Sequence, residues 1–555
     1  MDNRPSRADE RGQLSAAGIV IGIVGCVIIT ASSVYTALKM GALPWPTIFT
    51  SITALVLLRA LGRNSLNEAN VTQVIMSAGS MVAGGLAFTI PGIWMLGLEA
   101  DVTLGQMLLV ALAGTLLGLV CTALIHQRFV EESDLEYPIG VAAASTLEAS
   151  QAGGDTGRKL FGSMGIAGLY CVLRDVLGVL PAMLCNLAIP GVSFGIYNSP
   201  MMLSVGFLVG GVAVAFWLAG ALIGNFGLIA GGTALGIWDV STAQGIVSSL
   251  GMGLMMGSGL GVVVKDILPR IATLLKGTGE APSGQTLMRK GDAGVLAVVV
   301  AAAALLLCLG LGLSPVATVI VVLMSFVTTI MSAQSVGQTG IDPMEIFGLI
   351  VLLAVAALGE HDEVRLFFVA AVIAVACGLA GDVMSDFKTG QIIGTSPRVM
   401  WLGQAIGALL GTVVSAVVLA ALVGAYGPEA FGPGQLFVSA QASVVATMVS
   451  GIPSVSAFVV GLVLGVALYL AGLPAMMLGL GIYLPFYMSF TASLGALAKW
   501  VYDRVAASRA TDGAQDGKEL SHDETGIVVA SGLLGGESIV GVIIALATVV
   551  AGFAG

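Results

Sequence analysis

Charged side chains are scarce in this chain of 555 residues, and their scarcity decides the class of protein. Asp, Glu, Lys and Arg together make up 10% of the sequence, whereas ordinary soluble domains contain about 25%. Hydrophobic residues make up 57%, and the mean hydropathy is +1.00. A transmembrane helix needs about 20 apolar residues, so the chain has enough for roughly a dozen or more spans. The composition excludes a soluble enzyme and predicts one polytopic membrane domain.

Motifs that would indicate other functions are also missing. The sequence has no G-x-x-x-x-G-K-[ST] loop for ATP and no C-x-x-C pair, and its six cysteines are expected to pack as small apolar side chains. The three histidines, His126, His361 and His522, are scattered and none belongs to an H-E-x-x-H motif, so no built-in zinc site is predicted. The net charge of −10 argues against nucleic acid as a partner, because nucleic acid requires a basic surface.

Long stretches carry no formal charge at all, among them residues 293–341 and 430–498. In hydrocarbon every backbone N–H and C=O must be paired within the protein, which leaves helices or closed barrels. Barrel strands alternate apolar and polar residues over about ten positions, and these runs are far longer. We therefore predict an all-α fold, a polytopic membrane helix bundle.

Sixteen apolar segments are candidates for crossing or entering the membrane: residues 14–38, 43–61, 70–97, 103–129, 160–187, 201–224, 241–264, 292–312, 314–333, 343–358, 364–385, 399–424, 436–450, 455–472, 474–500 and 526–553. Two further apolar pieces, residues 139–149 and 226–237, are too short to span and suit re-entrant or broken helices. The prediction is about 14 to 16 transmembrane helices with some re-entrant or broken segments.

Basic loops divide the chain. The predicted parts are an N-terminal tail 1–13, a first transmembrane half 14–264, a basic loop 265–291, a second half 292–498, a loop 499–525 and a C-terminal membrane segment 526–555. Lys and Arg are concentrated in the tail and in both loops, which places all three on the cytoplasmic side. A faint echo between residues 245–257 and 526–536 favours two pseudo-repeated halves, as in many transporters.

The first polar cluster lies at the end of the first apolar segment. Tyr35 and Lys39 are four residues apart and share a helix face. One interpretation is a lysine that reaches out of the span end toward the membrane surface. The other is a cation that faces a substrate carboxylate.

The second cluster, residues 67–73, opens a Gly-rich apolar segment with Glu68, Asn70 and Gln73. Asn64 or Asn67 could cap a helix here, and the helix dipole would favour Glu68 near the N-terminus. A cap uses few of these groups, however. The remainder could line a polar cavity that binds peptide-like groups.

The third cluster contains Asp382 and Asp386, four residues apart on one helix face. Two neighbouring carboxylates at membrane depth do not both ionise readily, which suits a proton-carrying group. Lys388 could neutralise one of them, and an internal ion pair without a transport role is the structural alternative. Isolated acids such as Glu537 carry weaker signals, and Arg174 is expected to pair with Asp175.

At these clusters the chain resembles the oligopeptide transporter superfamily, which includes the yellow stripe-like metal-chelate transporters. The matching stretches are residues 35–41, 67–73, 131–140 (EESDLEYPIG), 382–398 (DVMSDFKTGQIIGTSPR), 481–485 (GIYLP) and 530–537 (ASGLLGGE). No N-P-G-P-F-like segment of the fungal and plant oligopeptide branch is present, which favours the prokaryotic and yellow stripe-like side. The resemblance implies a multi-pass symporter of the inner (plasma) membrane with a cytoplasmic N-terminus.

Such a symporter would use the proton gradient, rather than a cofactor, to import short peptides or metal complexes of amino-acid-derived chelators by alternating access. The resemblance implies a proton site at Asp382 or Asp386, together with Lys388. The implied substrate-binding residues are Tyr35, Lys39, Glu68, Asn70, Gln73 and Glu537. The lipid bilayer is an implied partner, and a homo-oligomer is compatible with the sequence. The alternatives are a membrane-embedded phosphohydrolase or ion pump that uses Asp382 and Asp386, or a passive channel.

Overall fold

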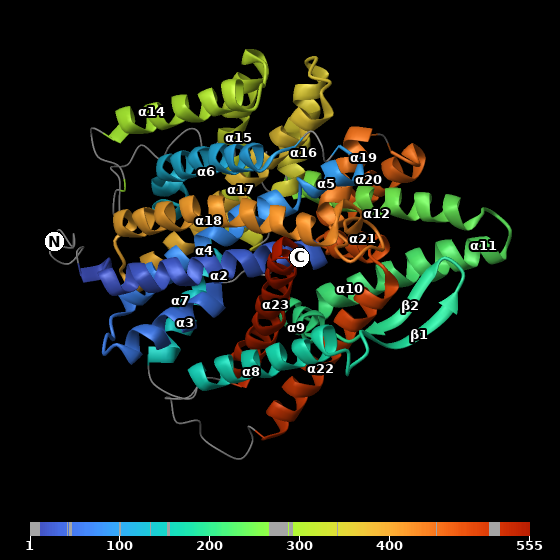
Figure 1. Cartoon of the computed structure of the whole chain (residues 1–555), viewed down its shortest axis with the longest axis horizontal. Helices are drawn as coiled ribbons and strands as arrows, with labels where there is room; N and C mark the ends of the chain where they lie inside the picture. The colour runs from blue at the N-terminus through green and yellow to red at the C-terminus, as the bar shows by residue number, and fades with distance from the viewer. Residues whose placement is uncertain are drawn as a thin grey trace.

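The structure is a computed structural model that describes residues 12–40, 43, 47–98, 102–133, 135–151, 156–262, 264–265, 287, 292–340, 342–450, 452–509 and 522–554. Most of the predicted N-terminal tail and of the basic loop 265–291 lies outside the described residues, as does 510–521 of the second loop. The described part is a bundle of helices with a single hairpin at one edge, beside helices α10 and α11 (Figure 1). The prediction of an all-α membrane bundle is confirmed.

The helices before the basic loop are α2 (Ala16–Met40), α3 (Thr47–Ala60), α4 (Leu66–Ala87), α5 (Pro91–Met95), α6 (Leu104–His126), α7 (Pro138–Gln151), α8 (Thr156–Cys171), α9 (Pro200–Val209), α10 (Gly211–Ala221), α11 (Gly232–Ala234) and α12 (Val240–Val262). Those after it are α14 (Asp292–Leu305), α15 (Pro315–Thr339), α16 (Met344–Ala357), α17 (Glu363–Ile393), α18 (Pro397–Tyr426), α19 (Ala440–Ser450), α20 (Val455–Leu470), α21 (Ala475–Tyr483), α22 (Phe486–Arg509) and α23 (His522–Ala554). Among the described residues, nine helices are long and apolar enough to cross a membrane.

Local signals set where the central helices begin and end. Ser65, Ser314 and Asp362 accept a hydrogen bond from the backbone at the starts of α4, α15 and α17. Helices α15 and α17 end at Gly340 and Gly394, which have the left-handed conformation that favours glycine. The N-cap of α4 is therefore Ser65, and the expectation of Asn64 or Asn67 in that role is wrong.

Helix α17 forms the centre of the bundle. It packs against α4, α6, α15 and α16, and Figure 1 shows it between α6 and α18. Its side chains are buried almost without interruption from Leu366 to Phe387, on every side of the helix. A helix that is apolar all round must be surrounded by protein or lipid. Asp382 and Asp386 therefore lie inside the protein.

The expected span at residues 160–187 is wrong. Helix α8 ends at Cys171, a π-helical turn η3 (Val172–Val176) follows, and the chain then forms an antiparallel hairpin of β1 (Met183–Ile189) and β2 (Val192–Tyr197). Pro190 and Gly191 make the turn, with Gly191 at a φ of +75°. A Pro-Gly pair cannot continue a helix and is a strong turn former, and apolarity alone concealed that signal.

Several helices are broken, as expected, although not always where the sequence suggested. The predicted short piece 139–149 is the 14-residue helix α7. Residues 226–237 are not a separate piece, because the π-helical segment η4 (Leu222–Gly231) continues α10 as far as Ala234. A break instead separates α9 from α10 at Gly210, where φ is +94°, and another separates α21 from α22 at Pro485.

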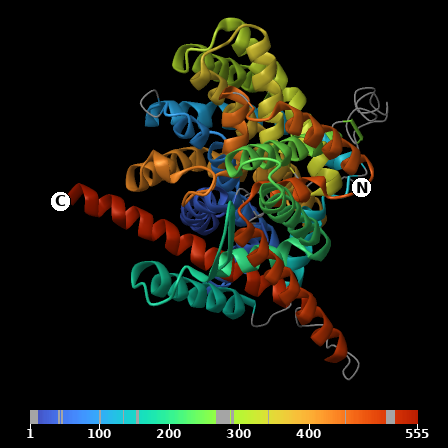
Figure 2. The ribbon, with the colours of Figure 1, turned by 90° about the vertical axis from the view of Figure 1, so that its right-hand side faces the viewer.

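Glycines bring pairs of helices into backbone contact. A Cβ on Gly253 of α12 would lie 2.2 Å from the carbonyl oxygen of Phe458, and one on Gly461 of α20 would lie 2.4 Å from that of Leu250. Small residues of this kind allow close approach where no hydrophobic effect drives helix association. Figure 2 shows the C-terminal part of α23 projecting from this packed bundle. The division into two pseudo-repeated halves stays a prediction.

Candidate substrate cavity and buried carboxylate cluster

Lys39 lies in the last turn of α2 and is surrounded by aromatic rings. Its Nζ donates a hydrogen bond to the Tyr197 hydroxyl at 3.3 Å and lies 5.8 Å from the ring centroids of Tyr35 and Tyr197 and 6.0 Å from that of Phe437. Such rings attract a cation through their negative faces. Among the described residues Lys39 forms no ion pair with a carboxylate, so its charge is available to a ligand.

Lys39 lines a cavity of about 120 Å³. The lining comes from α2, the end of β2, the start of α9, the loop before α19 and the start of α22: Lys39, Tyr197, Met201, Met202, Gln435, Leu436, Val438, Tyr487 and Met488. The surface combines one cation, two phenols and one amide with apolar side chains. A mostly apolar pocket with a few convergent polar groups is typical of a small-molecule site.

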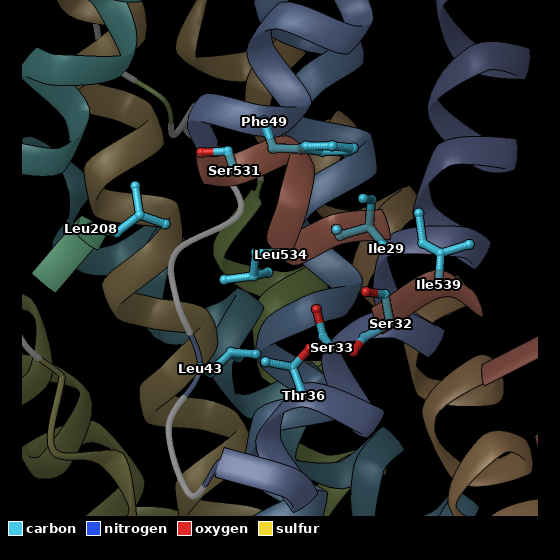
Figure 3. A pocket seen from close by; sticks show the side chains of 11 residues that line it. Ile29, Ser32, Ser33, Thr36, Leu43, Phe49, Leu208, Ser531, Leu534 and Ile539 are labelled. Carbon is cyan, nitrogen blue, oxygen red and sulfur yellow. Dashed lines mark hydrogen bonds between the residues drawn. The ribbon is translucent and has the colours of Figure 1, made fainter. Parts of the chain in front are cut away.

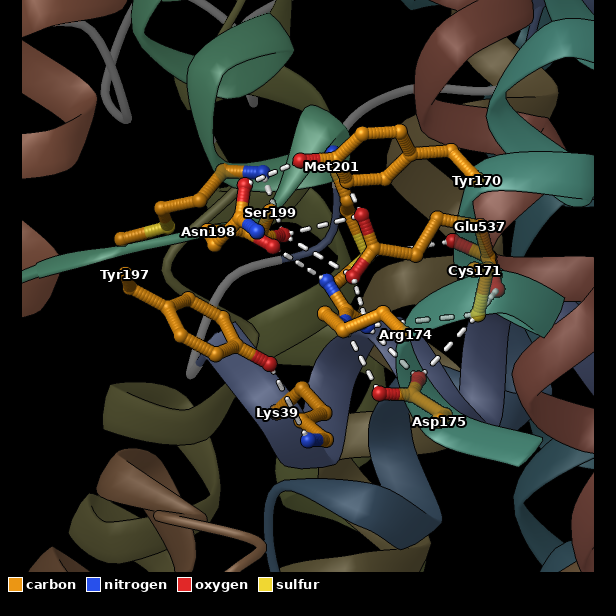
Figure 4. Close-up of polar contacts among 12 residues, drawn as sticks. Lys39, Tyr170, Cys171, Arg174, Asp175, Tyr197, Asn198, Ser199, Met201 and Glu537 are labelled. Atoms are coloured by element: carbon orange, nitrogen blue, oxygen red, sulfur yellow. Dashed lines mark hydrogen bonds and ion pairs between the residues drawn. The ribbon is translucent and has the colours of Figure 1, made fainter. Parts of the chain in front are cut away.

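An ionic network around the buried side chains of Arg174 and Glu537 lies beside this cavity (Figure 4). Arg174 donates to both carboxylate oxygens of Asp175, at 2.6 and 2.7 Å, and to Glu537 Oε1 at 2.8 Å. Its remaining nitrogen donates to the backbone carbonyl of Asn198 at 2.5 Å. The predicted pairing of Arg174 with Asp175 is therefore present. Glu537 is a second partner from the far end of the chain.

Glu537 is satisfied by protein groups on all sides. Besides Arg174, it accepts hydrogen bonds from the Ser199 hydroxyl at 3.0 Å and from the backbone N–H of Met201 at 2.8 Å. The carboxylate thus closes the N-terminus of α9, where exposed N–H groups favour an anion. Because Met201 also lines the cavity, Glu537 shapes the cavity wall rather than facing a ligand.

A second, smaller cavity of about 60 Å³ lies between α2, α3, α9 and α23 (Figure 3). Ser32, Ser33 and Thr36 of α2 point hydroxyl groups toward it, while Phe49, Leu208 and Leu534 close its sides. The Thr36 hydroxyl is also hydrogen-bonded to that of Ser538 at 2.8 Å. The residues of α2 that line this cavity, Ile29 to Thr36, lie about one to three helical turns before Lys39.

The buried carboxylate cluster comprises Asp382 and Asp386 of α17. Asp386 has the larger number of hydrogen-bond donors. It is fully buried and accepts hydrogen bonds from the side-chain amides of Gln73 at 3.1 Å and Gln404 at 2.5 Å, and from the Ser77 hydroxyl at 3.5 Å. The donors come from α4 and α18. Gln73, predicted to bind substrate, thus donates to Asp386, and its role in substrate binding stays a prediction.

Asp382, one turn earlier on α17, has a different environment. It is also fully buried, but neither of its carboxylate oxygens has a hydrogen-bond partner. An unpaired carboxylate in a dry interior is costly, so such a group is expected to hold a proton. Lys388, two residues beyond Asp386, forms no ion pair with Asp382 or Asp386 in the described part of the chain.

Glu68 and Asn70 lie far from Lys39. The Nε of Arg63 is 2.5 Å from Glu68 Oε1, and the Ser15 hydroxyl also donates to this carboxylate. Asn70 donates to the Thr395 hydroxyl at 3.1 Å. Ser15 precedes α2 and Lys39 ends it, so roughly 36 Å of helix separates them at 1.5 Å per residue. The six predicted substrate residues therefore do not form one site.

Three groups of predicted residues result. Tyr35, Lys39 and Glu537 gather around the cavity, Gln73 joins Asp386, and Glu68 and Asn70 lie at the opposite end of α2 and α4. Sequence reasoning missed Tyr197 and Gln435, whose strand and loop gave no ligand-binding signal. It also missed Asp342, whose Oδ2 accepts a hydrogen bond from Ser332 and whose Oδ1 is buried without a partner, although Gly340, Asp342 and Pro343 mark a polar break in a long apolar stretch.

Comparison with known proteins gives a family match across nearly the whole chain. A family model described as "OPT oligopeptide transporter protein" matches residues 13–548. A protein of Haemophilus influenzae named "Putative oligopeptide transporter" is 25% identical over 593 residues, which cover 92% of this chain and 92% of that protein.

Shorter matches connect the chain to plant proteins. The "Metal-nicotianamine transporter YSL2" of Arabidopsis thaliana is 40% identical over 92 residues, 15% of this chain and 13% of that protein. The protein of the same name from Oryza sativa subsp. japonica is 37% identical over 93 residues, again 15% of this chain and 13% of that protein.

Proposed function

Because this chain belongs to the oligopeptide transporter family, a family of membrane transporters rather than enzymes, we propose that it is a proton-coupled symporter. It imports short peptides or metal complexes of amino-acid-derived chelators across the inner (plasma) membrane, with its N-terminus in the cytoplasm. The observation that supports this most is the positive charge of Lys39, which lines a cavity and has no carboxylate partner among the described residues. Both substrate classes carry carboxylates that such a cation attracts.

The lining of the cavity suits either substrate. Lys39 and the Tyr197 hydroxyl hold a carboxylate, while the Gln435 amide has the donor and the acceptor that pair with a peptide group. A charge-assisted bond in a cavity shielded from water is stronger than a neutral one. The three methionines, Met201, Met202 and Met488, supply adaptable apolar contacts for variable side chains.

Proton coupling is assigned to the buried carboxylates of α17. Asp382 has no donor within reach, and Asp386 has three neutral donors. In alternating access, a proton and a substrate bind on the outer side, the protein changes conformation, and both leave on the inner side. Neutralising a carboxylate removes a buried charge that opposes that change.

Two other functions compete with this proposal. A phosphohydrolase or ion pump needs several carboxylates around its metal ions, and the described residues include no group of three or more His, Cys, Asp or Glu side chains that could hold a metal. A passive channel would conduct its substrate without regard to the proton gradient.

Uptake into proteoliposomes tests the proposal. The purified full-length protein is reconstituted, and accumulation of radiolabelled trialanine or nickel–nicotianamine is followed with and without an inward proton gradient. Accumulation above equilibrium that a protonophore abolishes supports symport. Uptake that is equal with and without the gradient would instead identify a channel, and the proposal would be wrong.

Asp382→Asn separates coupling from binding. We expect gradient-driven accumulation to be lost while exchange of labelled for unlabelled substrate continues, because exchange needs no net proton movement. Asp362→Asn is the matched control, since Asp362 is an exposed cap at the start of α17 and Asn is an equally good cap. Full accumulation by Asp382→Asn would refute the assignment.

A further inference from the structure

The turn between α15 and α16 reaches the interior of the central helix. The Ser332 hydroxyl oxygen of α15 lies 2.9 Å from the backbone carbonyl oxygen of Cys377 on α17. At the start of α16, Met344 lies against Gly378 of α17. One turn after Ser332, Val336 lies against Gly381, and one turn after Met344, Gly348 lies against Ala370. Helix α15 therefore runs along α17 in the same direction, and α16 returns in the opposite direction. The two helices form a hairpin whose tip meets α17.

This tip is deep in the bundle. It touches Gly381, which lies roughly 27 Å of helix from Glu363 and roughly 18 Å from Ile393 at 1.5 Å per residue. Both distances exceed half the thickness of a hydrocarbon core, which is about 30 Å. Broken helices at this depth are tolerated only where protein or a cavity surrounds them.

Asp342 occupies the tip. The Ser332 hydroxyl donates to its Oδ2 at 2.9 Å, while its Oδ1 has no hydrogen-bond partner. A Cβ on Gly381 would lie 2.6 Å from Asp342 Oδ2. The absence of a side chain at Gly381 thus makes room for this carboxylate, directly beside the residue that precedes Asp382.

In the described part of the chain, no Lys or Arg is paired with the acids near this tip. The titratable groups around Asp382 are Asp386 on the same helix, Asp342 at the hairpin tip and, beyond Asp342, Glu345 on α16. None of these four acids forms an ion pair with Lys or Arg within the described ranges. The Asp342 carboxylate packs against Gly381, the residue before Asp382. Like charges brought into one buried region oppose each other's ionisation, so we expect Asp342 and Asp382 to hold at least one proton between them.

We propose that Asp342 and Asp382 form a proton-sharing pair that carries the transported proton, while Asp386 stays ionised. The proposal rests on the proton coupling proposed above and names the acids that perform it. Asp386 is excluded from the pair because three donors satisfy its ionised form. Asp382 has none, and Asp342 has only the Ser332 hydroxyl.

The two acids of the pair differ in burial, which gives proton transfer between them a direction. Asp342 is half-buried as a residue, although its Oδ1 is buried, whereas Asp382 is fully buried. A proton taken up by the Asp342 carboxylate moves to Asp382: the O–H bond on Asp342 breaks as an O–H bond forms on Asp382. No other group changes its charge. Asp342 is then the entry group and Asp382 the storage group.

Infrared difference spectroscopy during a pH titration tests the pair without any substrate. The full-length protein in lipid is titrated, and the C=O stretch of a buried protonated carboxyl group is followed. We expect Asp382→Asn to abolish this band and Asp386→Asn to retain it. Asp342→Asn should move its midpoint toward acid by about one pH unit or more, because a neighbouring negative charge no longer favours protonation of Asp382.

Two results would overturn the proposal: an unchanged midpoint in Asp342→Asn, or loss of the band in Asp386→Asn alone. Asp362→Asn is the control that should change nothing. If Asp342→Asn does not assemble, Ser332→Ala replaces it. Removing the Ser332 donor disfavours ionised Asp342, so the midpoint of the pair should move toward alkaline pH, and an unchanged midpoint would again count against the pair.

The transport experiment distinguishes failure of the proposed proton coupling from failure of the proposed role of Asp342. Wild-type uptake that ignores the proton gradient would refute proton coupling, whatever the spectra show. Wild-type uptake that is proton-driven, together with full gradient-driven accumulation by Asp342→Asn, would refute only the role of Asp342.

Discussion

The carboxylate of Glu537 accepts a hydrogen bond from the backbone N–H of Met201 at 2.8 Å, so the C-terminal helix α23 closes the start of helix α9. The same carboxylate forms an ion pair with Arg174 at 2.8 Å. Three distant parts of the chain therefore meet at one buried charge. Because Met201 lines the Lys39 cavity, the stability of this junction also sets the shape of the cavity.

Glu537→Gln is expected to lower the free energy of unfolding by about 3 kcal/mol, because it leaves the buried Arg174 with only Asp175 as an anionic partner. The measurement is the thermal unfolding midpoint of the purified protein in detergent. Glu429→Gln is the control, since Glu429 is exposed. Equal midpoints for the two variants would show that the network contributes no stability.

Lys39→Gln is expected to weaken binding of the transported substrate about tenfold or more, the effect of losing one hydrogen bond to a charged group. Lys39→Arg should retain part of the affinity, because it keeps the charge. Affinity is measured by the concentration dependence of substrate exchange in proteoliposomes. Lys499→Gln removes a lysine in the second half of α22 and should leave affinity unchanged. Equal affinity in Lys39→Gln and wild type would remove Lys39 from the substrate site.

Glu68→Gln should alter stability but not substrate affinity. The Glu68 carboxylate is held by Arg63 and Ser15, at the opposite end of α2 from Lys39. Loss of its charge is expected to cost about 1 kcal/mol, since Arg63 is half exposed and water screens the pair. Thermal unfolding and substrate exchange, measured on the same preparation, check this. A large loss of affinity at normal stability would place Glu68 in the substrate path.

Gly461→Ala is expected to destabilise the protein by about 1 to 3 kcal/mol, because the added Cβ forces α20 away from α12. That Cβ would lie 2.4 Å from the backbone oxygen of Leu250, and backbone cannot move aside as a side chain can. Gly424→Ala is the matched control in helix α18, where a Cβ meets nothing within 4 Å. Its stability should be unchanged or slightly higher. Similar unfolding midpoints for both variants would contradict the packing.

Much of the fold could be predicted from the sequence, because charge-free runs leave helices as the economical way to satisfy a backbone in lipid. Spacing along one helix was equally informative. It placed Asp382 and Asp386 on one face, and Tyr35 beside Lys39. These relations are local, and the geometry of a helix determines them.

Relations between distant segments could not be predicted in this way. Nothing in the sequence shows that Arg174 meets Glu537, or that Asp342 reaches Gly381. The hairpin of β1 and β2 was missed because its residues are as apolar as those of a helix, and hydropathy does not distinguish the two. Only the Pro190 and Gly191 turn carried a signal. The bonds of Glu68 to Arg63 and Ser15 could not be predicted either, because a polar helix start resembles a polar cavity lining.

The glycine contacts between α12 and α20 have a mechanical consequence. Where the two backbones are in contact, no side chains lie between them that could repack. Helices α12 and α20 are therefore expected to move together as one rigid body. Any movement that alternately opens the two sides of the membrane must then bend elsewhere. Gly210 and Pro485, where α9 parts from α10 and α21 from α22, are the joints already present in the chain. Both lie within a few turns of the Lys39 cavity, so a ligand bound there would rest against the moving parts.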